Sequence, residues 1–192
     1  MQEENRMINE TVQAIFDRRS NRGYADEPVS EENIEILKQV ALASPTARNE
    51  QSWHFSFVTN KELINEVEKT AYDQAVAEGD ESFIAVMKSR NNKIFYDAPL
   101  VIFISADASS QWGEIDSGIA VENLALAAHS LGLGSVIIGL CGKAFNGDYA
   151  AQLGEKLGFP EGSRFTIAIC IGKPTVSKDA HPVRDGKIIE IK

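Results

Sequence analysis

The residues best suited to chemistry are three arginines and a serine in one short segment. Residues 18–22, called the arginine segment below, read RRSNR and follow a stretch with helical spacing. Guanidinium groups hold phosphate through paired, charge-assisted hydrogen bonds, and a serine hydroxyl adds a compact donor. Cations at this place can also complement the C-terminal end of a helix dipole. The arginine segment is therefore a candidate anion site, with stabilisation of the helix end as the alternative.

A proline-led loop offers groups that suit the edge of a planar heterocycle. This loop, residues 45–53, reads PTARNEQSW. Its backbone supplies N–H donors, and the side-chain amides of Asn49 and Gln51 both donate and accept hydrogen bonds. The alternative is a plain connection between a helix and a strand, in which the amides only satisfy the backbone.

Other patterns argue against several familiar kinds of site. Neither GLGS at residues 132–135 nor GLCG at residues 139–142 completes the G-x-G-x-x-G pattern, and no Walker lysine follows either of them. Cys141 and Cys170 show no ligand spacing, so we expect two buried thiols and no metal site. No arrangement of serine, histidine and aspartate indicates a nucleophile.

The elements that must hold these residues alternate irregularly along the chain. Helical spacing favours helices over residues 9–18, 31–43, 61–78, 81–92, 113–131 and 149–157. Apolar or alternating runs favour strands over residues 53–58, 99–105, 135–138 and 164–172. The helix over residues 113–131 is rich in small residues, which let other backbones approach closely, so we expect it at the centre. We predict an α+β fold with helices packed around one sheet.

Length and charge limit the class of protein further. A chain of 192 residues fits one domain, and its polar end from about residue 173 predicts a tail along the surface or onto a partner. With 28 acidic and 19 basic residues the net charge is −9, which disfavours nucleic acid as a partner. The longest apolar run, about residues 99–104, is too short to cross a bilayer. Residues 1–6 do not resemble a secretory signal, so we expect a cytoplasmic protein without membrane association.

Four segments together resemble the nitroreductase family of FMN flavoproteins. They are RRSNRGY at 18–24, SPTARNEQSW at 44–53, DSGIAVENL at 116–124 and LGLGSVIIG at 131–139. Their order and spacing match the family along nearly the whole chain, which is similar to its shorter members. The resemblance implies an α+β homodimer around a single central mixed sheet. It also implies two FMN molecules at the subunit interface, each touched by both chains.

The resemblance further implies which residues hold FMN. The arginine segment would contact the phosphate and the flavin edge through Arg18, Arg19, Ser20 and Arg22. The proline-led loop would line the flavin through Pro45, Thr46, Ala47, Asn49 and Gln51. A backbone N–H near flavin N5 would come from Gly139 or Leu140. A basic residue near the C-terminus would join the phosphate site; Arg184 is the nearest match, and Lys173 and Lys187 compete with it.

Two features limit what the resemblance implies. Ser52 stands where many members have proline before the tryptophan, which changes the stiffness of the loop. The region between Val58 and Asp97 is of modest length. It varies within the family and shapes the substrate opening, so the substrate stays open.

The function that the resemblance implies is that of an FMN-dependent oxidoreductase with a ping-pong cycle. NAD(P)H would supply electrons, and a small-molecule acceptor such as a nitroaromatic, a quinone or a related conjugated compound would then take them. Because the flavin carries this chemistry, we name no catalytic side chain. Two alternatives stay open. One is another reaction on the same fold, such as reductive dehalogenation or flavin fragmentation. The other is a flavin-binding or redox-sensing protein without NAD(P)H turnover.

Overall fold

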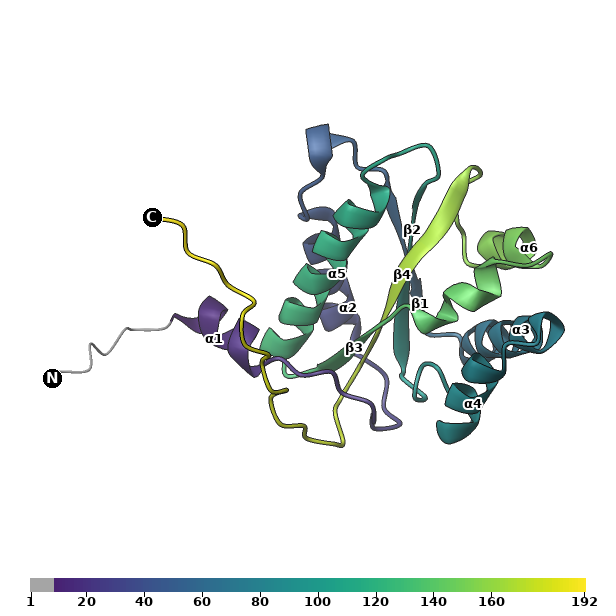
Figure 1. Ribbon diagram of the computed structural model, residues 1–192, viewed down its shortest axis with the longest axis horizontal. Coiled ribbons are helices and arrows are strands. Elements are labelled where there is room, and N and C mark those ends of the chain that lie inside the picture. The colour runs from purple at the N-terminus through teal and green to yellow at the C-terminus, as the bar shows by residue number, and fades with distance from the viewer. Residues whose placement is uncertain (1–8) are drawn as a thin grey trace, which may run out of the picture.

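The protein is built around one four-stranded sheet with helices on both faces (Figure 1). A computed structural model describes residues 9–192, so the expectation about a signal in residues 1–6 lies outside the described residues. The strands run in the order β1-β2-β4-β3 across the sheet. Their bounds are β1 Trp53–Val58, β2 Leu100–Asp107, β3 Gly134–Ile138 and β4 Ser163–Gly172. The predicted α+β class is confirmed.

The helices form two layers. One face of the sheet is covered by α2 (Glu31–Leu42) and α5 (Gly113–Ser130) (Figure 1). The other face is covered by α3 (Lys61–Glu78), α4 (Glu81–Ser89) and α6 (Ala150–Lys156). Two 3₁₀ helices that the sequence did not predict, η1 (Ala47–Asn49) and η2 (Leu140–Phe145), follow α2 and β3. The short helix α1 (Glu10–Asp17) projects beside α5 and buries none of its residues.

The expected mixed sheet is wrong, because all three strand pairs of this sheet are antiparallel. The helices α3 and α4 return the chain to the end of the sheet that it left, so β2 runs antiparallel to β1. A single helix, α5, carries the chain from the end of β2 back to the start of β3, which makes β2 and β3 parallel to each other. They are not neighbours, however, because β4 lies between them and pairs antiparallel with both.

The core follows from the alternation of side chains along the buried strand β2. Val101 and Phe103 pack with the layer of α3, α4 and α6, whereas Leu100, Ile102 and Ile104 pack with α2 and α5. All five side chains are fully buried, as a continuous apolar run in a central strand predicts. The free thiols of Cys141 and Cys170 are also buried, as expected.

The long helix α5 lies directly on the sheet. Ala120, Ala125 and Ala128 are fully buried, which confirms the central position that its small residues predict. At its first residue, Gly113, a Cβ atom would lie 2.8 Å from the Cβ of Ala106 in β2. Only glycine permits that approach, so the start of α5 is fixed against the end of β2.

Most helix starts follow the capping residues that the sequence offers. The side chains of Asn9, Ser30, Asn60 and Asp80 each accept a hydrogen bond from the backbone N–H three residues later. The helix α4 ends at Ser89 instead of reaching residue 92. Its predicted last two residues, Asn91 and Asn92, have left-handed φ values of 53° and 59°, which a helix does not permit.

The C-terminal tail begins beside the sheet and then leaves it. Residues 173–192 are exposed throughout. The first few pair with the chain just after the arginine segment, through Tyr24–Pro174 and the bond from Thr175 N–H to Gly23 C=O. Figure 1 shows the rest of the tail extending on the side of α1. Among residues 9–192, no helix is both long and apolar enough to span a membrane.

A buried glutamate ties the chain before β2 to α3, and its removal provides a test of the fold. Glu68 is 6% exposed, and its Oε1 accepts the N–H groups of Ile94 and Phe95 at 2.7 and 2.8 Å. We expect Glu68→Ala to lower the free energy of unfolding by about 3 kcal/mol, because two buried donors lose a charged acceptor. Glu68→Gln keeps an acceptor oxygen and should cost about 1 kcal/mol.

Urea denaturation of the wild type and both variants measures these differences. The control is Glu62→Ala, which removes an exposed acid from the same helix. Equal stability of Glu68→Ala and Glu62→Ala would contradict the role given to Glu68.

Candidate functional site

The arginine segment lies against the outer edge of β3. Ser20 forms a parallel bridge with Ser135, and the Asn21 N–H donates to the Ser135 carbonyl at 2.8 Å. Gly134 permits this arrangement, because a Cβ there would lie 2.9 Å from the Asn21 side chain and 2.8 Å from Pro174. The segment is thus held between the start of β3 and the start of the tail.

The three arginines have different surroundings. Arg18 faces Glu122 of α5, with 3.2 Å between Nε and Oε1. That Nε is buried and this contact lacks hydrogen-bond geometry, so we regard the pair as a charge contact and not as a satisfied hydrogen bond. Arg19 donates to the carbonyls of Phe16 and Arg18 at the end of α1, at 2.5 and 2.9 Å. Arg22 is exposed and donates to the Ser20 carbonyl at 3.3 Å.

These surroundings support both interpretations of the arginine segment. Arg19 does complement the end of α1, as the alternative predicts. Arg22 keeps most of its donors toward solvent, where an anion can reach them.

The proline-led loop has an unusual backbone. Arg48, Asn49 and Gln51 have φ values of 55°, 56° and 48°, in the left-handed region that residues other than glycine rarely adopt. The loop is closed by its own side chains: Thr46 Oγ1 accepts the Gln51 N–H at 3.1 Å, and Gln51 Nε2 donates to Asn49 Oδ1 at 2.9 Å. Pro45, Asn49 and Gln51 are exposed, so the loop presents its amides outward.

Two residues of α5 anchor this loop, and sequence reasoning did not assign them to the site. Asp116 Oδ1 accepts the Ala47 N–H at 3.1 Å. Asn123, two turns later, donates to the Ser44 hydroxyl at 3.0 Å, and that hydroxyl donates to the Val40 carbonyl. The signal in the sequence was two polar residues seven apart on a helix of small residues, a spacing that puts both on one face.

Gly139 and Leu140 follow β3 and lead into η2. Lys143 of η2 forms salt bridges with Glu78 at 2.7 Å and with Asp80 at 2.8 Å. Hydrogen bonds from Lys143, from the Phe83 N–H and from Ser82 hold the pKa of Asp80 well below its usual range. The turn between α3 and α4 therefore fixes η2, and with it the chain that follows Gly139.

The structure brings some predicted residues together and separates others. The proline-led loop lies where β1 starts, β2 ends and α5 begins, whereas Gly139 follows β3 at the opposite edge of the sheet. The arginine segment lies at the other end of β3, beside Ser135. Gly139 lies four residues beyond Ser135, so Gly139 and the arginine segment are separated along β3 by roughly 13 Å.

The C-terminal candidates are exposed or already paired. Arg184 and Lys187 are exposed in the tail. Lys173 forms a salt bridge with Glu27 at 3.0 Å. The side chain that would complete a phosphate site from the C-terminus therefore stays a prediction.

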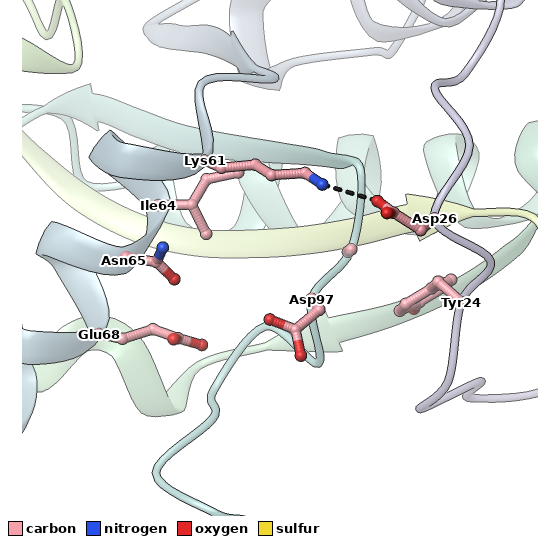
Figure 2. A pocket seen from close by; sticks show the side chains of 8 residues that line it. Tyr24, Asp26, Lys61, Ile64, Asn65, Glu68 and Asp97 are labelled. Atoms are coloured by element: carbon pink, nitrogen blue, oxygen red, sulfur yellow. Dashed lines mark hydrogen bonds and ion pairs between the residues drawn. The ribbon is translucent and has the colours of Figure 1, made fainter.

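A cavity of about 250 Å³ lies near the arginine segment but has the wrong charge for phosphate. Figure 2 shows it between α3, the chain before β2 and the chain after Tyr24. Its lining carries three carboxylates and one lysine, and that Lys61 pairs with Asp26 at 2.7 Å. Asp26 raises the pKa of Lys61, so the lysine stays charged but is already neutralised. None of the predicted FMN residues lines this cavity.

Comparisons with known proteins agree with the geometry. A sequence model described as the nitroreductase family matches residues 15–173. The NADPH-flavin oxidoreductase of Vibrio harveyi is 31% identical over 179 residues, which cover 91% of this chain and 70% of that protein. The crystal structure of a nitroreductase with bound FMN from Desulfitobacterium hafniense is 32% identical, with a TM-score of 0.91 over 97% of this chain and all of that one. An FMN-dependent nitroreductase from Clostridium difficile is 26% identical, with a TM-score of 0.77 over 95% and 99% of the two chains.

The contact between Lys143 and Asp80 predicts a pH dependence of stability. Because the pKa of Asp80 is lowered in the folded state, its charge stabilises the protein fully above the usual value of 3.8, and this stabilisation is lost as the pH falls through the lower pKa. Asp80→Asn keeps a capping side chain but removes the charge. We expect this variant to be less stable than the wild type at pH 7 and the difference to shrink below pH 3.8.

Urea denaturation at a series of pH values measures this difference. Asp148→Asn, at an exposed aspartate a few residues beyond η2, serves as the control. A difference for Asp80→Asn that stays constant down to acid pH would contradict the assignment.

Proposed function

The chain belongs to the nitroreductase family, and on that basis we propose that it is an FMN-dependent NAD(P)H oxidoreductase. In this proposal residues 1–192 form one FMN-binding domain with an extended tail from about residue 173. The acceptors are nitroaromatics, quinones or related conjugated compounds, reduced in a ping-pong cycle. The observation that carries the proposal is the placement of the arginine segment and of the chain after Gly139 at opposite ends of β3.

This separation suits FMN, which carries its phosphate and its ring system at opposite ends of a ribityl chain. The donors also fit, because Arg22 offers an exposed guanidinium and Arg18 a buried Nε that lacks a hydrogen bond among the described residues. At the other end of β3 lie the backbone N–H groups of Gly139 and Leu140, and the proline-led loop before β1 offers side-chain amides; both kinds of donor suit the polar edge of a flavin. The FMN-bound relative from Desulfitobacterium hafniense supports the same cofactor.

The residues of this chain would bind and orient, and FMN when bound supplies the two-electron chemistry between a nicotinamide and an acceptor. Arg22 and Ser20 would hold the phosphate. Asn49 and Gln51 would meet the ring edge, and the N–H of Gly139 or Leu140 would point at N5. Hydrogen-bond donors that are already in place would stabilise the negative charge that develops on the flavin ring during reduction. In this role the protein needs no side-chain acid or base.

A homodimer is part of the proposal, and uncovered apolar side chains support it. Ile15 and Phe16 of α1 and Ile115 of α5 are more than half exposed. In the tail, Ile188 and Ile191 are 87% and 94% exposed. Large apolar side chains left exposed in a fold are candidates for an interaction surface. A second copy of the chain would cover them and would bring its own loop or tail to the FMN site.

FMN binding is the first test. We expect the purified protein to bind FMN, and Arg22→Ala to raise the dissociation constant about tenfold or more, because a charge-assisted hydrogen bond to phosphate is lost. Titration of FMN fluorescence with the apoprotein measures the affinity. Arg164→Ala, which removes an exposed arginine paired with Glu114, should bind as the wild type does. A colourless protein that takes up no FMN would end the proposal.

The same sample separates the enzyme from the alternatives. Anaerobic NADH or NADPH should bleach the flavin absorption, and a nitroaromatic or quinone should restore it. A flavin that stays oxidised under excess NADH and NADPH would favour a binding or redox-sensing protein. Turnover of halogenated substrates but not of nitroaromatics would favour dehalogenation.

The tail provides the test of the dimer. We expect serine at positions 188, 189 and 191, in place of the three isoleucines, to shift the protein from dimer to monomer, because the buried apolar area of the interface is lost. Sedimentation velocity measures the change. Replacing Lys178 and Lys192, two exposed lysines of the tail, by serine is the matched control. A wild-type protein that sediments as a monomer while loaded with FMN would refute the dimer.

A further inference from the structure

The side chain of Asp116 is buried to a degree that packing alone does not explain. It is 2% exposed on the first turn of α5. Its Oδ1 accepts the Ala47 N–H at 3.1 Å, and its Oδ2 is buried without a hydrogen-bond partner among the described residues. A buried carboxyl group with a single protein hydrogen bond is an expensive feature for a fold. The positive end of the α5 dipole offsets part of this cost.

The segment that Asp116 holds is strained. Ala47 begins η1, and the next residues, Arg48 and Asn49, both have left-handed φ values, as does Gln51. Three such residues within four positions raise the energy of this conformation, so it persists only where other contacts hold it. The Ala47 N–H at the start of the strained stretch is the point at which α5 holds it.

The helix that carries Asp116 is itself fixed. Gly113 lies against Ala106 of β2 with no room for a side chain, and Ser117 donates to the Gly113 carbonyl at 2.6 Å. Because β2 is the central buried strand, Asp116 relates the loop to the whole sheet. This contact holds the N-terminal part of the loop that presents Asn49 and Gln51, while the bond from the Asp107 N–H to the Ser52 carbonyl, at 3.0 Å, holds its C-terminal end to β2.

We propose that Asp116 is a positioning residue for the flavin site, acting through the Ala47 N–H to hold the proline-led loop in its strained form. The inference rests on the proposed function, since the loop matters to FMN only if FMN binds there. Asp116 touches neither FMN nor substrate in this role. Its side-chain oxygen sets where the amides of Asn49 and Gln51 meet the ring.

Hydrogen exchange of the apoprotein tests the anchoring without FMN. In Asp116→Ala we expect the amides of residues 46–51 to exchange about tenfold faster, as the loss of one hydrogen bond would give, with α2 and β2 unchanged. Asp116→Asn still presents an oxygen to the Ala47 N–H, so it should exchange as the wild type does. Glu114→Ala is the matched control, since it removes an exposed acid from the same helical turn without touching the loop. Unchanged exchange in Asp116→Ala would overturn the proposal.

FMN affinity gives the second readout. Asp116→Ala should raise the dissociation constant about tenfold, as expected for the loss of one hydrogen bond to a charged acceptor. Asp116→Asn should stay within about threefold of the wild type. If no variant, the wild type included, binds FMN but the exchange result holds, the proposed function fails and the anchoring stands. If FMN binds equally to the wild type and Asp116→Ala, this inference alone fails.

A variant on the loop side guards against a misfolded Asp116→Ala. Ala47→Pro removes the N–H that donates to Asp116. Proline should be tolerated at this position, because Thr46, with φ −129° and ψ 151°, has a conformation allowed before proline. Ala47 is also the first residue of a helical turn, where proline is common. We expect Ala47→Pro to weaken FMN binding about as much as Asp116→Ala, and the double variant to show no further loss. Losses that multiply in the double variant would mean that the two residues act independently, and would overturn the proposal.

Discussion

The close contact between α5 and the sheet is the constraint on which the other parts of the molecule depend. Gly113 lies against Ala106, and the fully buried alanines of α5 keep the helix close to β2 and β4 along its length. Asp116 and Asn123 hold the proline-led loop from one face of the helix, while Glu122 meets Arg18 from another. Asp116 and Glu122 are six residues apart, about 9 Å along the axis. A larger residue at Gly113 would therefore displace both groups of candidate ligands together.

Charge is distributed so that the arginine segment stands apart from the rest of an acidic chain. In the nearby cavity Asp26 neutralises Lys61, as Figure 2 shows, and Lys93 next to the cavity pairs with Glu68 and Asp97. Among the described residues that line it, no cation is left unpaired to attract an anion. Arg22, by contrast, is exposed and bonds only to a carbonyl among the described residues. Arg22 thus offers a local attraction for a phosphate at the edge of β3, because charges are screened over about 8–10 Å.

The sequence predicts local structure well here and distant contacts poorly. The strand over residues 53–58 and the helix over 61–78 match the structure residue for residue, because period and caps are local signals. The mixed sheet was wrong because the insertion of β4 between β2 and β3 depends on contacts far apart in sequence. For the same reason the contacts of Asp116 with Ala47 and of Arg18 with Glu122, which span 69 and 104 positions, were not foreseen. The residues themselves pointed to the arginine segment and to the amides of the loop, and family resemblance completed the site list, but neither shows what holds these residues.

The position of β4 also has a consequence for how the chain folds during synthesis. Both pairings of β4, with β2 and with β3, need residues 163–172, which a ribosome makes after the other three strands. Until then β2 has only β1 as a neighbour, and the apolar run of β3 has no strand beside it. During synthesis the apolar segments of β2 and β3 therefore stay partly unpaired until β4 has been made. Pairings of this long sequence separation are slow to form, and exposed strands of this kind are those that chaperones protect.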